Sequence, residues 1–365
     1  MRVDDAGSWD SIGQSLARGD GFVEDGKPTT VRPPVYPLFL ASVYKIFGHS
    51  PAAARWIQIV LSALAAVFIF WTARLLFDEK TALCAGLSLG IYPPLVVYSA
   101  IIGSETLFIF FLSLFLYILT RARMGSSIKP YILSGVTLGL TNLCRSTLSL
   151  YPLFFLALLF PLKGARKETM KILTLAAVSL AVMSPWTIRN YLNFKGFMLV
   201  NVSSGQLFWT GTILENKGRY VEDTPYEGYR RFDPFLNDPI LWEREMFKAG
   251  LENIRKNPLG YAGITFYKIG VFLFEPVGYT ITKHKSTFLA ALLLLVHAAL
   301  MILAFYGIFL TFESYERFIP FYALFLYFAM MHSIFAPMPR FRLPIEPFLI
   351  LFAAVGLLRL RGPAA

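Results

Sequence analysis

Charged residues are scarce in this chain: Lys, Arg, Asp and Glu make up only 16% of its 365 residues. In soluble domains, charged residues make up about a quarter of the sequence. Hydrophobic residues account for 56%, and the mean hydropathy is +0.55. Several apolar runs reach about 17–25 residues, the length needed to cross a hydrocarbon core roughly 30 Å thick. The scarcity of charge therefore excludes a soluble protein and predicts an integral membrane protein.

Residues and motifs that build common sites are also scarce. The two cysteines, Cys84 and Cys144, both lie inside apolar runs, so the sequence predicts no disulfide or zinc framework. The four histidines are scattered without the spacing of metal ligands. No P-loop, GxSxG or HExxH motif is present. No internal repeat of the kind that builds many secondary transporters is present either.

The net charge of +11 does not indicate a nucleic-acid partner. Much of the positive charge lies in short loops between apolar runs, where it sets orientation and contacts anionic headgroups. No polar segment combines a Lys/Arg cluster with interleaved aromatic residues. We therefore expect membrane lipids as partners and no nucleic acid.

The apolar runs predict an all-α polytopic bundle. Predicted membrane helices cover residues 52–77, 81–100, 104–120, 131–144, 146–162, 169–188, 259–281, 286–311, 317–336 and 343–360. The segment 34–47 is too short to span and is predicted as a short interfacial helix. The chain divides into a first external loop with interfacial helices (1–51), a transmembrane bundle (52–188), an external loop region (189–257) and a C-terminal transmembrane region (258–365).

Positively charged loops predict the orientation. Arg121, Arg123 and Lys129 lie between two runs, and a second basic cluster lies at 163–171, so both loops are expected on the cytoplasmic side. Alternation then places the first fifty residues, the turn before the run at 104–120 and the long polar region on the opposite face. The candidate carboxylates therefore gather on the non-cytoplasmic side.

The run at 259–281 leaves the orientation of the last third open. Lys268, Glu275 and Pro276 interrupt this run, which weakens it as a simple span. If it spans fully, the loop holding Arg340 becomes cytoplasmic. If it is re-entrant or interfacial, that loop becomes external, and we favour this arrangement.

Carboxylates of the first and second external segments are candidates for catalysis. Asp5 and Trp9 are spaced i, i+4, and Asp4 is adjacent, so a helix here would place Asp5 and Trp9 on one face. A carboxylate just above the membrane can act as a general base on a hydroxyl. A helix cap or a solvated tail is the alternative. Glu105 opens an apolar run, where an ordinary capping role is the alternative to an acidic site residue.

Four arginines are candidates for binding an anion. Arg145 lies between two apolar runs and is expected to pair with a carboxylate such as Glu105 or with a lipid phosphate. Arg189, at the external end of its helix, could also extend to the headgroups. Arg340 and Arg342 could clamp a phosphate through bidentate hydrogen bonds, or anchor a cytoplasmic loop.

A polar, glycine-containing segment at 201–223 includes Trp209 and Tyr220. Aromatic faces for stacking, together with amides and hydroxyls for hydrogen bonds, suit a loop that binds a sugar. The same composition also occurs in any ordered surface loop.

Seven segments, in this order, resemble the C-type membrane glycosyltransferases (GT-C). They are DDAGSWDSIGQSLARGDGF, RPPVYPLFLASVYKIFG, IYPPLVVYSAIIGSETLF, GLTNLCRS, SPWTIRNY, SSGQLFWTGT and PRFRLPIEP. The group includes protein O-mannosyltransferases, aminoarabinose transferases of lipid A and galacturonosyltransferases of bacterial lipopolysaccharide. The resemblance covers nearly the whole chain.

The resemblance implies transfer of a sugar from a polyprenyl-phosphate donor to a hydroxyl of a lipid, glycan or protein acceptor, with inversion. It implies a site on the periplasmic or extracellular face of the cell (inner) membrane. Asp5, with Asp4 close by, matches the catalytic base, and Glu105 matches a second acidic residue. The phosphate would be held by basic residues, for which the candidates are Arg145, Arg189, Arg340 and Arg342, with Trp9 and Trp209 also expected to bind substrate. No cofactor is certain, and a divalent metal stays open.

One departure from the family concerns the first loop. Relatives carry a membrane helix before it, whereas this sequence starts at the loop, so a preceding helix is expected to be missing. Two other functions stay open. A glycan ligase or polymerase would use an oligosaccharide on a pyrophosphate, and a glycolipid transporter or flippase would line a path with charges.

Overall fold

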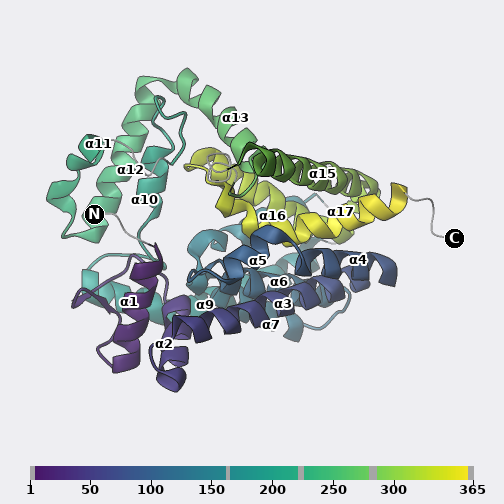
Figure 1. The fold of residues 1–365 in the computed structure, drawn as a ribbon, viewed down its shortest axis with the longest axis horizontal. Helices are drawn as coiled ribbons and strands as arrows, with labels where there is room; N and C mark the ends of the chain where they lie inside the picture. Colours follow the sequence, from purple (N-terminus) through teal and green to yellow (C-terminus); the bar gives the residue numbers. More distant parts are fainter. Residues whose placement is uncertain (1–4, 162–164, 221–225, 279–285, 361–365) are drawn as a thin grey trace. The chain divides into compact units, whose positions relative to one another are not determined.

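The computed structural model describes residues 5–161, 165–220, 226–278 and 286–360. Regular structure in these ranges is helical except for one short hairpin (Figure 1). The chain forms two compact units. Unit 1 comprises residues 1–186, 298–324 and 343–365, and unit 2 comprises residues 187–297 and 325–342.

Unit 1 begins with two short helices that lie side by side (Figure 1). Helix α1 (Asp5–Arg18) and helix α2 (Val35–Phe47) flank an antiparallel hairpin of β1 (Val23–Glu24) and β2 (Lys27–Pro28). At Gly13 an added Cβ atom would lie 2.8 Å from the Cβ of Leu40, so the two helices approach closely there. The helix expected at 34–47 is confirmed.

The bundle of unit 1 is built around α3 (Pro51–Leu76) and α6 (Glu105–Arg123), which pack on each other. Helix α4 (Glu79–Gly90) and helix α5 (Pro93–Ser99) pack on α3, and α7 (Lys129–Cys144) packs on α6. Within its most apolar stretch α6 is 67% buried, against 33% for α3. Because α6 is enclosed by protein, the residues at its ends are positioned by packing.

The run expected as one helix over 81–100 is interrupted. Helices α4 and α5 meet at a bend of 51°. Pro93 and Pro94 lie in the first turn of α5, and the missing N–H and rigid ring of proline end the preceding helix. This break corrects the prediction of one continuous helix over 81–100.

Small residues bring α7 against α9 (Ala165–Phe194). An added Cβ at Gly135 would lie 2.6 Å from the Leu175 carbonyl oxygen, and one at Gly139 would lie 2.7 Å from the Cβ of Val182. This spacing of small residues lets two helix backbones approach, as it commonly does in membranes.

Two groups of helices, one directly after α7 and one near the C-terminus, complete unit 1. Helix η1 (Ser146–Leu148) and α8 (Tyr151–Leu159) follow α7, and the other elements are the C-terminal part of α15 (Thr287–Thr311), η3 (Phe312–Ser314), the start of α16 (Tyr315–Ile334) and α17 (Glu346–Leu360). Helix α17 packs on α4 and α3. The Tyr151 hydroxyl donates to the Pro320 carbonyl at 2.8 Å, which joins α8 to α16.

Unit 2 holds the long polar region. Its elements are α10 (Ser204–Thr210), α11 (Tyr226–Arg230), η2 (Asp233–Phe235), α12 (Pro239–Lys256), α13 (Pro258–Phe274) and most of η4 (Pro339–Ile345), with the ends of α9 and α16 and the start of α15. Helices α10 and α12 lie side by side (Figure 1). Trp209, Phe232, Met246 and Ala249 form the buried cluster at their contact.

Among the residues that the structure describes, four helical segments are long and apolar enough to cross a membrane, and the bent pair α4–α5 would make a fifth. They are Pro51–Leu76, Glu105–Arg123, Arg166–Phe194 and Thr287–Ile334. The chain is therefore a multi-pass membrane protein. Helix α13 ends at Phe274, and its 17 residues cover only about 26 Å. The run expected at 259–281 is thus shorter as a helix than a typical hydrocarbon core.

Candidate functional site

An ion pair at the start of α6 is the first candidate feature. The Arg145 guanidinium donates to Glu105 Oε1 at 2.7 Å and to the Ser104 hydroxyl at 3.4 Å. Their side chains are 22% and 12% exposed, so the pair is shielded yet reachable. Of the two partners considered for Arg145, a carboxylate or a lipid phosphate, the structure shows the carboxylate.

Local sequence explains where this pair lies. Glu105 is the first residue of α6, where the helix dipole favours a carboxylate. Its Oε2 lies 2.7 Å from where a Cβ on Gly103 would be, so the carboxylate packs closely over the backbone of Gly103. Arg145 directly follows α7, with an extended backbone. Glu105 therefore combines a place in the first turn of α6 with an ion pair to Arg145.

A buried hydrogen-bond chain connects α2 to the turn before α6. The Tyr36 hydroxyl donates to Gln58 Oε1 at 2.6 Å. The Gln58 amide then donates to the carbonyls of Ser99 and Ile101 at 3.0 and 2.7 Å. Burial raises the pKa of Tyr36 far above its ordinary value, so its hydroxyl stays a donor. The segment leading to Glu105 is thereby tied to the first-loop helices.

Trp9 of α1 packs against Tyr36, the first residue of this hydrogen-bond chain. Its ring meets that of Tyr36 edge to face, with centroids 5.2 Å apart. The Arg32 guanidinium lies 4.8 Å from the Trp9 ring centroid, and its Nε donates to the Ser8 hydroxyl at 3.2 Å. Trp9 is only 5% exposed, so packing and a cation–π contact fix it.

The two predicted bases lie at the edge of the described structure. Asp5 is the first residue of α1, one turn before Trp9, but the description does not extend to its side chain. Asp4 lies outside the described residues. Their role as base therefore stays a prediction.

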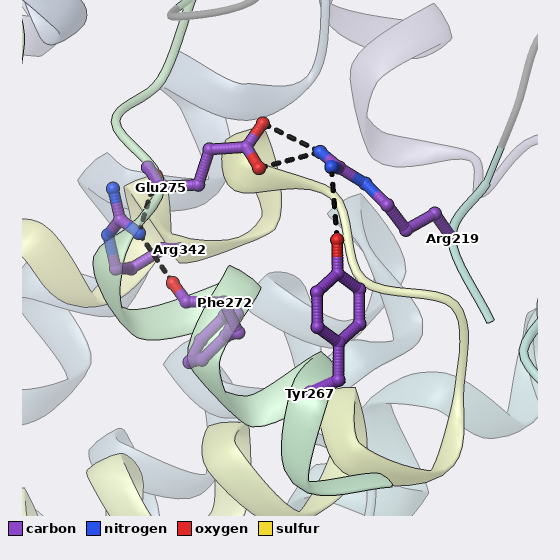
Figure 2. A network of polar contacts seen from close by, with 5 residues as sticks. All are labelled: Arg219, Tyr267, Phe272, Glu275 and Arg342. Atoms are coloured by element: carbon purple, nitrogen blue, oxygen red, sulfur yellow. Dashed lines mark hydrogen bonds and ion pairs between the residues drawn. The ribbon is translucent and has the colours of Figure 1, made fainter. Parts of the chain in front are cut away.

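In unit 2, a network of polar contacts surrounds the end of α13 (Figure 2). One Arg219 nitrogen donates to both oxygens of Glu275, at 2.7 and 2.6 Å, and another contacts the Tyr267 hydroxyl at 3.5 Å. Burial alone would lower the pKa of Arg219, but the Glu275 carboxylate and the Tyr267 hydroxyl together outweigh burial, so the pKa is raised. The loop after α10 is thus fastened to α13 by a charged pair.

Arg342 approaches the same helix end from the other side, as Figure 2 shows. Its Nη1 donates to the carbonyls of Phe272 and Glu275, at 2.5 and 3.0 Å. The residue is 0% exposed. A guanidinium at a helix C-terminus satisfies carbonyls that lack partners within the helix. The expectation that Arg342 clamps a phosphate is corrected: buried hydrogen bonds make it a cap of α13.

The other predicted substrate-binding residues of unit 2 make different contacts. Trp209 is 4% exposed and packs edge to face against Tyr229 and Phe232. Its ring fills a core, which corrects the expectation of a stacking surface for sugar. Arg189, in α9, is half-buried beside Asn190, which accepts from it at 3.0 Å. Arg340 is half-buried, with its guanidinium 5.6 Å from the Phe341 ring centroid.

A partly buried carboxylate lies at the start of α10. Glu243 Oε1 accepts from the Ser204 hydroxyl at 2.5 Å and from the Gly205 N–H at 2.8 Å. Burial raises the pKa of Glu243 despite these hydrogen bonds. The contact joins α12 to α10 and supports the hydrophobic cluster beside it.

Several polar residues of these networks were not singled out from the sequence. Gln58 is a polar residue in an apolar run, which is a signal of an internal hydrogen bond. Glu275 was noted only as an interruption of such a run. Arg32 and Arg219 had no such signal, because arginines in polar loops are ordinary.

Comparison with known proteins begins with the family described as dolichyl-phosphate-mannose-protein mannosyltransferase, whose model matches residues 31–188. No curated protein sequence matches the chain. The matched segment includes Glu105 and Arg145.

Solved structures of an archaeal oligosaccharyltransferase share the fold at low sequence identity, and ArnT matches with a lower TM-score. The oligosaccharyltransferase of Archaeoglobus fulgidus, tethered with an acceptor peptide, has a TM-score of 0.60 and 17% identity, over 98% of this chain and 45% of that chain. AglB from the same organism, in complex with an inhibitory peptide and a dolichol-phosphate, has a TM-score of 0.58 and 18% identity, over 98% of this chain and 46% of that chain. ArnT from Cupriavidus metallidurans, bound to undecaprenyl phosphate, has a TM-score of 0.43 and 13% identity, over 97% of this chain and 73% of that chain.

The chain therefore spans less than half the length of the Archaeoglobus fulgidus structures that it matches. The fold class expected from the sequence, an all-α polytopic bundle of the GT-C type, is confirmed. The resemblance to GT-C glycosyltransferases is confirmed as well, by sequence over 31–188 and by fold over nearly the whole chain.

Proposed function

We propose that the chain is a membrane glycosyltransferase that moves a sugar from a polyprenyl-phosphate donor to an acceptor hydroxyl on the non-cytoplasmic face. The observation that carries the proposal is the match of residues 31–188 to the mannosyltransferase family, since this segment holds the Glu105–Arg145 pair. The shared fold supports it. So does the complex of AglB with a dolichol-phosphate, a lipid carrier of the proposed kind.

The proposed reaction is a single displacement. Asp5 takes the proton from the acceptor hydroxyl, and the acceptor oxygen bonds to the anomeric carbon. The bond from that carbon to the phosphate oxygen breaks, which releases polyprenyl phosphate and inverts the anomeric centre. Attack and departure on opposite faces of one carbon require this inversion.

Arginine side chains would stabilise the charge that grows on the leaving phosphate. Arg145, Arg189 and Arg340 are the candidates. Arg145 is held by Glu105 at 2.7 Å, so its guanidinium is oriented before the donor arrives. A lipid-anchored donor also enters with its reacting group at a fixed depth, which lowers the entropic cost of the reaction.

The run at 259–281 is proposed to be re-entrant or interfacial. The helical part is short, and Glu275 with its partner Arg219 lies just beyond its end. A charged pair is costly in hydrocarbon, so an end at the membrane surface suits it better. Under this arrangement the loop that holds Arg340 would be external.

The test is sugar transfer by the purified protein in lipid nanodiscs, with a panel of polyprenyl-phosphate sugars and membrane-extract acceptors. The variant is Asp5→Asn, and the matched control is Asp20→Asn, because Asp20 carries the same charge in an exposed pair with Arg18. We expect a loss of at least about 100-fold for Asp5→Asn and an unchanged rate for the control. Unaffected transfer in Asp5→Asn would move the base to Asp4 or Glu105.

Two further outcomes would replace the proposal. Transfer only of an oligosaccharide from a pyrophosphate carrier would identify a glycan ligase or polymerase. Movement of lipid-linked sugar across reconstituted vesicles, without transfer from any donor, would identify a flippase.

A further inference from the structure

The turn between α5 and α6 has no regular structure, and its second half, residues 102–104, is buried. Buried backbone groups need hydrogen-bond partners, and an irregular turn cannot supply all of them from its own backbone. Here a side chain of another helix supplies two donors. The Gln58 amide of α3 donates to the carbonyls of Ser99 and Ile101, at 3.0 and 2.7 Å.

Gln58 uses both ends of its amide. Its Oε1 accepts from the Tyr36 hydroxyl at 2.6 Å, while its nitrogen donates to the two carbonyls. The side chain is 0% exposed, and a buried amide in an apolar helix is costly unless its hydrogen bonds are made. A reversed amide would turn its oxygen toward two carbonyl oxygens, so one orientation is fixed. Gln58 therefore joins α2, α3 and the turn in a single geometry.

The same turn contacts both members of the Glu105–Arg145 pair. The Glu105 carboxylate packs closely over the backbone of Gly103, and the Ser104 hydroxyl accepts from Arg145 at 3.4 Å. The Cys144 thiol, next to Arg145 in the chain, donates to the Ser104 carbonyl at 3.6 Å. A shift of this turn would therefore change how the carboxylate and the guanidinium meet.

We propose that Gln58 is a positioning residue for sugar transfer, because it holds the turn that orients the Glu105–Arg145 pair. The inference rests on the proposed function, in which Arg145 stabilises the charge on the leaving phosphate. Gln58 touches no reacting atom in this scheme and acts through the carbonyls of Ser99 and Ile101. A role in stability alone would leave the turn in place and the rate per folded molecule unchanged.

Two variants separate these roles. Gln58→Met keeps a side chain of similar length but removes the donors and the acceptor. Gln58→Glu keeps the acceptor for Tyr36 and can donate to one carbonyl at most, and it decides the test if Gln58→Met does not fold. The matched control is Thr72→Val, about four turns further along α3. Thr72 is also buried, but its hydroxyl donates within its own helix, to the Phe68 carbonyl at 2.7 Å.

The first test needs no substrate and uses Cys144 as a reporter of the turn. Cys144 is buried beside Ser104, whereas Cys84 in α4 is partly exposed and serves as the internal reference. The full chain in lipid nanodiscs is treated with a small, membrane-permeant maleimide. The labelling rate of each cysteine is measured by mass spectrometry on the monodisperse, folded fraction.

We expect the labelling rate of Cys144 to rise roughly tenfold in Gln58→Met and less in Gln58→Glu, because carbonyls that lose a buried donor shift toward other partners. The rate at Cys84 should stay unchanged, and Thr72→Val should behave as wild type. Equal Cys144 rates in the Gln58 variants and in Thr72→Val would overturn the proposal. A rise shared by Cys84 would also overturn it, since that indicates general loosening of the bundle.

The second test measures transfer from a polyprenyl-phosphate sugar. A misoriented Arg145 weakens stabilisation of the transition state, so kcat should fall roughly tenfold in Gln58→Met while KM for the donor stays within about twofold. Thr72→Val should change neither. A displaced turn with unchanged kcat would overturn the positioning role. If the wild type transfers no sugar, the proposed function fails, and the labelling rates still decide whether Gln58 holds the turn.

Discussion

Two arginines with the same expected task have opposite surroundings. Arg145, in unit 1, faces the Glu105 carboxylate with 22% of its side chain exposed. Arg342, in unit 2, is 0% exposed and donates to two backbone carbonyls of α13. A guanidinium paired to one carboxylate at a partly open position can turn to a second anion. One that caps a buried helix end cannot do so without unfolding that end.

The largest effect that would sharpen this contrast is expected from Arg342→Ala. The change leaves the carbonyls at Phe272 and Glu275 without this donor and removes a buried side chain, which should cost about 3 kcal/mol or more. The measurement is the thermal midpoint of the detergent-solubilised protein by size-exclusion chromatography. Arg340→Ala, next to it in η4, should keep the midpoint and weaken donor binding. Equal midpoints for the two variants would contradict the capping role.

A second comparison concerns two ion pairs of unit 1. Glu105→Gln should lower sugar transfer by about 100-fold while the protein stays folded, because it releases Arg145 from its orientation. Glu168→Gln breaks the ion pair in which Arg123 Nε lies 2.5 Å from Glu168 Oε1. This change should lower the stability of the fold without affecting sugar transfer. For each variant, both kcat/KM for sugar transfer and the thermal midpoint of unfolding are measured.

The combined variant Glu105→Gln with Arg145→Gln tests whether the two residues act together. A coupling free energy of roughly 1–3 kcal/mol in stability is expected from a double-mutant cycle. Transfer should not recover in the double variant. Recovery of transfer would show that Arg145 serves only to neutralise Glu105.

The smallest expected effect concerns Glu243 of unit 2. Its pKa is raised in the folded state by burial, so the protonated form is favoured there. The stability that it contributes is present below the ordinary pKa of a glutamate and is lost as pH rises through the folded value. Glu243→Gln keeps an oxygen for Ser204 and should become more stable than the wild type as pH rises.

The measurement is the difference in thermal midpoint between Glu243→Gln and the wild type, from about pH 4 to about pH 8. Glu245→Gln on the same helix, whose carboxylate pairs with Lys248 at 2.5 Å, is the control and should show no such trend. A constant difference across the range would mean that Glu243 is not strained by burial.

The sequence by itself determined the membrane class, the order of the helices and the resemblance, because these depend on long apolar runs and on motifs in fixed order. The helices at 35–47 and 51–76 were predicted to within a residue. Local chemistry also indicated the bend at Pro93, although the run was assigned as one helix. Such features depend on residues that are close together in the sequence.

The sequence offered Glu105 as one of two kinds of partner for Arg145 and gave no partner for Asp10, and the tertiary structure decided both. Glu105 and Arg145 are separated by forty positions, yet they pair at 2.7 Å, and Asp10 finds His49 thirty-nine positions away. The same packing placed Trp209 and Arg342 inside and removed them from the proposed site. Burial and pairing arise from how helices pack on each other. The local sequence around an arginine or a tryptophan therefore does not tell whether its side chain caps a helix, fills a core or faces solvent.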